Sequence, residues 1–72
     1  MSTLGERLKA LRMSKQIRQV EMAELLGVSD RHYQRIEHNQ VNISYLVLIT
    51  LADFFDVSLD YLVGRSDNPE RR

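Results

Sequence analysis

The stretch that decides the fold is residues 19–38, which read QVEMAELLGVSDRHYQRIEH. Apolar residues recur at helical spacing on both sides of Gly27, and glycine takes the left-handed backbone of a helix end at low cost. Ser29 is a favourable N-cap for a second helix. The stretch therefore predicts two short helices, at about residues 19–27 and 30–38, joined by a tight turn.

Further helices are predicted outside this stretch, at residues 3–14, 44–55 and 59–63. Thr3 and Glu6 have the spacing of a capping box, and Ser44 and Ser58 are favourable N-cap residues. Gly64 is placed to close the last helix. No alternating β-pattern is present, so the chain is predicted to be all-α, with five helices.

Size and composition bound what this chain can be. Its 72 residues and 8.4 kDa suffice for one small domain, predicted at residues 3–64, followed by a polar tail at residues 65–72 that is expected to be disordered. The absence of cysteine excludes disulfides and thiolate metal sites. The longest apolar run, residues 45–49, is far shorter than the roughly 20 residues that span a bilayer. We therefore expect a soluble, cytoplasmic protein that does not contact a membrane.

Charge is balanced overall but not along the chain. Ten basic and ten acidic residues cancel, which argues against a general polyanion binder. Residues 1–35 hold seven basic and four acidic residues, a net charge of +3, whereas residues 36–72 hold three and six, a net charge of −3. Such a split suits a protein that presents its first half to an anion, although it also arises by chance.

Two short helices joined by a glycine-containing turn are the arrangement of a helix-turn-helix motif. In its second helix, Tyr33 and Ile36 form the apolar stripe, and the outer face is left to Asp30, Arg31, Gln34 and Arg35. These are side chains that can read base edges in a major groove, which is wide enough to take one helix. Asp30 has a second interpretation, as a carboxylate that stabilises the positive N-terminus of the helix.

Three segments carry a family resemblance, namely residues 19–29 (QVEMAELLGVS), 33–37 (YQRIE) and 57–62 (VSLDYL). With them, the chain resembles the phage Cro and lambda-repressor type helix-turn-helix family, also called Xre-like, over about residues 4–64. The resemblance implies a five-helix DNA-binding domain with the helix at residues 30–38 in the major groove. It also implies a transcriptional regulator that is usually a dimer.

The resemblance assigns roles to single residues as well. It places Asp30, Arg31 and Arg35 against bases, and it makes Gln19 a phosphate ligand at the start of its helix. The loop at residues 39–42 is implied to grip the DNA backbone, here with the neutral donors Asn39, Gln40 and Asn42 in place of the usual lysine or arginine. Arg12 and Glu37 match a pair that forms a buried salt bridge.

Two departures from the family pattern stand on either side of the first turn. Arg18 occupies the usual Ser/Thr cap of the second helix, so one cap is lost, and its guanidinium is free to bind phosphate instead. Gln16 occupies the place of a glycine after the first helix, which predicts a strained left-handed residue.

Other chemistry-bearing residues have ordinary interpretations. His32 and His38 point to different faces and have no cysteine partner, so no metal site is predicted. The acidic residues Asp53, Asp56 and Asp60 are expected to form a solvated edge. No nucleophile, base and orienting group assemble, so an enzyme is disfavoured, and no cofactor or small-molecule ligand is expected.

The helix at residues 44–55 carries more apolar surface than one core face needs. Its predicted buried stripe comprises Tyr45, Leu48, Ile49, Ala52 and Phe55. The apolar residues of this helix that lie off the stripe are predicted to form an exposed patch with a tyrosine of the last helix. The patch comprises Leu46, Val47, Phe54 and Tyr61. Such patches commonly mark partner surfaces, and we expect this one to be a dimer interface, the alternative being that it packs under the last helix or the tail.

These observations predict a sequence-specific DNA-binding transcriptional regulator, most simply a dimeric repressor of a phage, mobile-element or bacterial operon. Its partner would be a palindromic double-stranded operator. The alternative is a protein-interaction module, such as an antitoxin or the target of an anti-repressor, that uses the apolar surface of the helix at residues 44–55.

Overall fold

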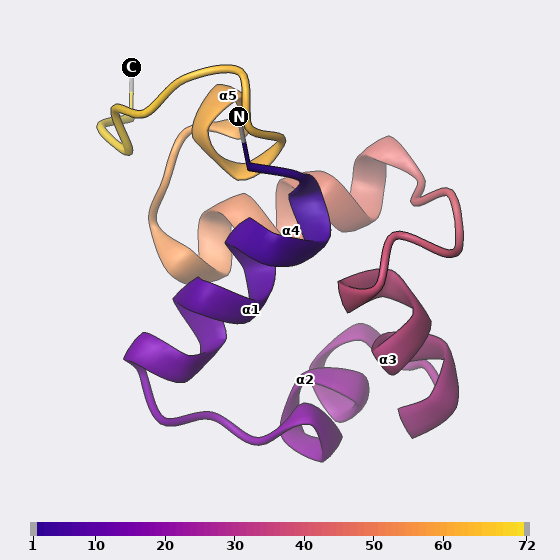
Figure 1. The fold of residues 1–72 in the computed structure, drawn as a ribbon. Coiled ribbons are helices and arrows are strands. Elements are labelled where there is room, and N and C mark those ends of the chain that lie inside the picture. The colour runs from indigo at the N-terminus through magenta and orange to yellow at the C-terminus, as the bar shows by residue number, and fades with distance from the viewer. Residues whose placement is uncertain (1, 72) are drawn as a thin grey trace.

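The computed structural model describes residues 2–71 and forms one bundle of α-helices (Figure 1). The helices are α1 (Leu4–Ser14), α2 (Gln19–Leu26), α3 (Asp30–Glu37), α4 (Tyr45–Phe55) and α5 (Leu59–Leu62). The described part of the chain contains no strand. The prediction of five helices is confirmed, and each predicted end lies within one residue of the observed end.

Side-chain caps explain where most of these helices begin. The hydroxyl oxygens of Thr3, Ser29, Ser44 and Ser58 accept hydrogen bonds from the backbone N–H three residues later, at 3.2, 3.1, 3.4 and 3.0 Å. α2 is the exception, because Arg18 supplies no side-chain cap. There the chain uses the reverse bond, in which the backbone N–H of Arg18 donates to the Glu21 carboxylate at 3.0 Å.

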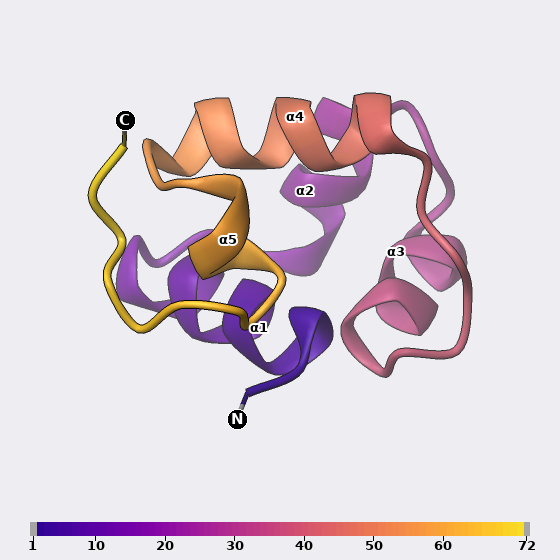
Figure 2. The same ribbon diagram turned by 90° about the horizontal axis from the view of Figure 1, so that it is seen from above.

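Every helix contributes one completely buried side chain to a single core. These side chains are Leu8, Met22, Tyr33, Leu51 and Leu62. α1 packs against α3 and α5, α2 packs against α3, and α4 packs against α5. In Figure 2, α4 lies along the upper edge, and α3 stands at the right, where its outer side is not covered by another helix.

α4 differs from the prediction in which face it buries. Leu51, Ala52 and Phe55 are buried, whereas Tyr45 is 71% exposed and Ile49 is 40% exposed. Tyr45 and Ile49 were predicted to belong to the buried stripe, so that part of the prediction is wrong. The buried face centres on Leu51, because α4 turns that side toward the other helices of the core.

Residues 65–71, which belong to the predicted tail, make several contacts with the rest of the domain. The backbone N–H of Ser58 donates to Pro69 at 3.0 Å, and the Arg71 guanidinium donates to the Ala52 carbonyl at 3.1 Å and to the Asp53 carboxylate at 2.6 Å. Arg71 therefore links this segment to the end of α4. Arg72, the last residue of the predicted tail, lies outside the described residues.

Candidate nucleic-acid interface

The turn between α2 and α3 is closed by backbone geometry that few residues besides glycine adopt. Gly27 has φ +69° and ψ +32°, in the left-handed region. This reversal lets the backbone N–H of Val28 donate to the Ala23 carbonyl at 3.0 Å, which satisfies one of the free carbonyls of α2. The Ser29 hydroxyl then caps α3. The turn thus fixes α3 against α2.

α3 buries one face and exposes the other. Tyr33, Ile36 and Glu37 are buried, and the four side chains predicted to read bases, those of Asp30, Arg31, Gln34 and Arg35, are all exposed. Within residues 2–71, none of these four side chains makes a hydrogen bond or an ion pair. The structure therefore brings the predicted base-reading residues to one helix face with their polar groups available to a partner.

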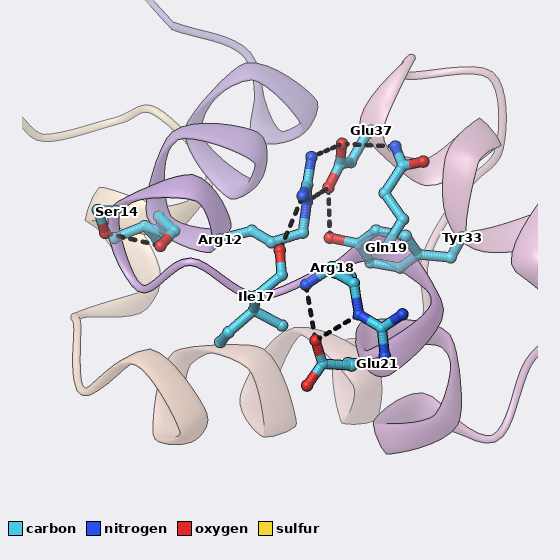
Figure 3. Close-up of polar contacts among 9 residues, drawn as sticks. Arg12, Ser14, Ile17, Arg18, Gln19, Glu21, Tyr33 and Glu37 are labelled. Carbon is cyan, nitrogen blue, oxygen red and sulfur yellow. Dashed lines mark hydrogen bonds and ion pairs between the residues drawn. The ribbon is translucent and has the colours of Figure 1, made fainter.

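Beneath this face, Arg12 and Glu37 form the salt bridge that the resemblance implied (Figure 3). The Arg12 Nε donates to Glu37 Oε2 at 2.6 Å, and its Nη2 donates to Oε1 at 3.3 Å. The remaining Nη1 donates to the Ile17 carbonyl at 2.9 Å, so the guanidinium ties α1 to both α3 and the turn before α2. A bidentate pair of this kind fixes orientation as well as charge.

The Glu37 carboxylate has two further donors. The Tyr33 hydroxyl donates to Oε2 at 2.5 Å, and the Gln19 amide nitrogen donates to Oε1 at 3.1 Å. Burial by itself raises the pKa of Glu37, but the hydrogen bonds from Arg12, Tyr33 and Gln19 outweigh it, and the pKa lies below its usual value. Glu37 is therefore a buried anion with four donors.

Sequence reasoning missed this role of the Tyr33 hydroxyl. The prediction placed the ring in the core, where it is, because the apolar stripe of α3 needs a side chain there. The signal that could have found the hydroxyl contact is the spacing of Tyr33 and Glu37, which lie four residues apart and therefore on the same side of α3. Burial raises the pKa of Tyr33, so the hydroxyl remains a donor.

The five predicted phosphate ligands lie in different environments. Arg18 is exposed and pairs with Glu21 at 3.1 Å, and Gln19 is half-buried on Glu37. The Asn39 side chain accepts from the Gly5 backbone N–H at 2.9 Å and donates to the Thr3 hydroxyl at 2.9 Å, so it joins the loop to the start of α1. Gln40 and Asn42 are exposed.

The predicted dimer-interface residues differ in exposure. Leu46 is 61% exposed and Phe54 is 42% exposed, whereas Val47 and Tyr61 are partly buried against the core. The Tyr61 ring is covered by the guanidinium of Arg7, whose central carbon lies 3.9 Å from the ring centroid. Tyr45 and Ile49 of α4 are also exposed, at 71% and 40%.

Other features of the described residues leave the α3 surface as the main candidate. No helix in residues 2–71 is long and apolar enough to cross a membrane, and no three His, Cys, Asp or Glu side chains there gather to hold a metal ion. A hollow of about 440 Å³ lies between α2 and α4. It is lined by Ile17, Glu21, Met22, Glu24, Leu25 and Phe54.

Comparison with known sequences agrees with this geometry. A family model described as helix-turn-helix matches residues 8–62. The "uncharacterized HTH-type transcriptional regulators" YobD and YqaE of Bacillus subtilis (strain 168) are 31% identical over 65 residues and 36% identical over 64 residues, covering 90% and 89% of this chain. The match covers 58% and 55% of those proteins, so this chain spans little more than half their length.

A third relative and two solved structures extend the comparison. The HTH-type transcriptional regulator PrpR of Mycobacterium tuberculosis is 35% identical over 63 residues, 88% of this chain and 13% of PrpR. The P22 c2 repressor, solved with a synthetic operator, superposes with a TM-score of 0.80 at 27% identity over 92% of this chain and all of that one. The restriction-modification controller protein C.AhdI of Aeromonas hydrophila gives 0.71 at 30% identity, over 82% and 89% of the two chains.

Proposed function

The chain belongs to the helix-turn-helix family of the lambda-repressor type, and from this premise we propose that it is a sequence-specific DNA-binding transcriptional regulator. The observation that carries the proposal is the outer face of α3, where four exposed polar side chains have no partner in the described residues. The P22 c2 repressor, which has the same fold, was solved with an operator, and this supports the proposal.

The proposed base contacts follow from side-chain chemistry. Arg31 and Arg35 lie four residues apart on α3, and an arginine can pair with guanine through two hydrogen bonds in the major groove. Gln34 lies on the same face and can pair with adenine. Asp30 starts the helix, where its carboxylate either accepts from a cytosine amino group or stabilises the helix N-terminus.

The proposed phosphate contacts come from the segments that flank α3. Gln19 and Arg18 stand at the start of α2, where free backbone N–H groups favour an anion, and Gln40 and Asn42 stand in the exposed loop after α3. Asn39 belongs to the same loop, but its side chain is used to hold α1. Like Gln19 and Arg18, Asn39 thus combines a contact within the protein with its proposed role as a phosphate ligand.

We propose that the protein acts as a dimer on a palindromic operator. Tyr45, Leu46 and Ile49 present apolar side chains on the outer side of α4, and a symmetric pair of chains would cover them. Two copies of α3 would then enter successive major grooves about 34 Å apart. A repressor of a phage, mobile-element or bacterial operon is the simplest such regulator. It would act in the cytoplasm, where the DNA is. Such a repressor needs no enzymatic activity.

Selection from a pool of random DNA duplexes tests the proposal. The purified protein is expected to enrich one inverted repeat, whose half-sites are separated by about one turn of DNA. Its affinity for random DNA should be lower and should fall steeply with salt. If no sequence were enriched, even at low salt, the proposed function would be wrong and the alternative role as a protein-interaction module would gain support.

A further inference from the structure

The inference concerns how Gln19 is held, and it rests on the proposed DNA-binding function. A glutamine amide has a donor end and an acceptor end, and only the donor end suits a phosphate, whose oxygens all accept. The Gln19 nitrogen donates one hydrogen to Glu37 Oε1, and Figure 3 shows the amide oxygen turned away from the carboxylate. Because a carboxylate only accepts hydrogen bonds, Glu37 requires the NH₂ end of the Gln19 amide, and not its oxygen, to face it.

The orientation of the Glu37 carboxylate is set in turn by its second oxygen. Oε2 accepts from the Tyr33 hydroxyl at 2.5 Å and from Arg12 Nε at 2.6 Å. Arg12 reaches Glu37 from α1, whereas Tyr33 stands on α3 itself, one turn before Glu37, and its ring is completely buried. A buried ring on the same helix gives the hydroxyl a fixed position. Tyr33 therefore acts together with Arg12, which donates to both oxygens, to hold Oε2 and, through the rigid carboxylate, Oε1.

We propose that Tyr33 is a positioning residue for DNA binding: through Glu37 it holds the Gln19 amide with its second N–H available to a backbone phosphate. Tyr33 touches no DNA itself. The chain Tyr33–Glu37–Gln19 joins the buried side of α3 to the start of α2, so the same residue that fills the core also orders the contact at the DNA surface. Among the described residues, no buried polar side-chain atom lacks a hydrogen-bond partner.

A double-mutant cycle tests the proposal. Tyr33→Phe removes only the hydroxyl and is expected to weaken binding of the selected duplex by about three- to tenfold. In a Gln19→Ala background the same change should have less than about a 1.5-fold effect, because the group that Tyr33 positions is gone. Equal effects of Tyr33→Phe in the two backgrounds would mean that Tyr33 only supports the fold, and would overturn the proposal.

Tyr61→Phe is the matched control. It removes the same hydroxyl from a ring that lies under Arg7, away from the Glu37 cluster, and DNA affinity should be unchanged. A loss equal to that of Tyr33→Phe would show that either hydroxyl acts through general stability, and would also overturn the proposal.

A second measurement uses the wild-type protein alone, without DNA and without any variant. In the wild-type protein, the side-chain NH₂ resonances of Gln19 should be resolved by NMR and should exchange with water more slowly than those of the exposed Gln40. Equal exchange at the two residues would remove the proposed positioning. The NMR result separates the positioning of Gln19 from the proposed DNA-binding function. A protein that enriched no DNA sequence would contradict the proposed function, but the Gln19 NH₂ group could still exchange slowly.

Discussion

Glu37 is a charge held in the core by four donors. Arg12→Met would leave that charge without its cation, and we expect the free energy of unfolding to fall by about 3–5 kcal/mol. Replacing Arg12 and Glu37 together by methionine should restore much of the loss, because no unpaired charge remains. Urea unfolding of the single and double variants measures this. Losses that simply add would mean that the pair does not interact.

Glu37 also predicts how stability depends on pH. Its pKa in the folded protein is lower than the usual value of an unfolded chain, because donors from Arg12, Tyr33 and Gln19 outweigh burial. A lowered pKa contributes stability that is complete above the unfolded value and is lost as the pH falls through the folded value. The contribution of Glu37 to wild-type stability should therefore be lost as the pH falls below the usual glutamate pKa of about 4.3 and through the lower pKa of the folded protein.

Glu37→Gln should be less stable near neutral pH but should lose less on acidification, because the titrating carboxyl is absent. Glu24→Gln, at an exposed glutamate without an ion pair in the described residues, is the control and should follow the wild-type curve. Thermal or urea unfolding at a series of pH values decides the matter. An acid profile of Glu37→Gln that paralleled the wild type would assign the dependence to other carboxyls.

Single residues also show which contacts can be predicted from the sequence and which cannot. The pairing of Arg12 with Glu37 follows from the resemblance, and the structure contains it. The side chain of Asn39 also bonds to Gly5 and Thr3, across 34 and 36 residues of chain, and the sequence did not predict these two contacts. A contact between segments so distant in sequence depends on how α1 meets α3, which no local pattern records.

At the scale of the elements, the turn after α1 carries strain that a substitution can relieve. Gln16 has φ +57°, a left-handed conformation that costs a residue with a side chain about 1 kcal/mol. Gln16→Gly should therefore stabilise the protein by about 0.5–1 kcal/mol. Lys15→Gly, one residue earlier at φ −101°, is the control and should destabilise it. Stabilisation by both changes, or by neither, in urea unfolding would contradict the assignment of strain to Gln16.

α4 shows why an element can be predicted while its buried face is not. Nine of its eleven residues are apolar, so its periodicity has little contrast with which to choose a side. The predicted stripe included Tyr45 and Ile49 and omitted Leu51, which is completely buried. The helix ends could be predicted because serine, threonine and glycine cap a helix through contacts with residues close in sequence. The buried side of α4 depends instead on the helices that pack against it.

At the scale of the whole molecule, the exposed apolar side of α4 predicts self-association. Leu46→Glu should give a folded monomer with weak operator binding, because two carboxylates would meet without partners across a two-fold axis. Leu59→Glu introduces the same charge at an exposed residue of α5 and is the control, which should remain dimeric. Sedimentation with circular dichroism reports both properties. A dimeric Leu46→Glu variant, or a monomeric parent at tens of micromolar, would assign this surface to another partner.

The central claim is that the outer face of α3 reads DNA sequence, and competition between the selected duplex and random DNA measures it directly. Arg31→Ala and Arg35→Ala should each lose about 1–3 kcal/mol of discrimination, while Gln19→Ala should weaken binding to both DNAs alike and leave their ratio unchanged. Arg65→Ala, at an exposed arginine of the tail, should change neither affinity. An undiminished preference for the selected duplex in both α3 variants would show that α3 is not the reader.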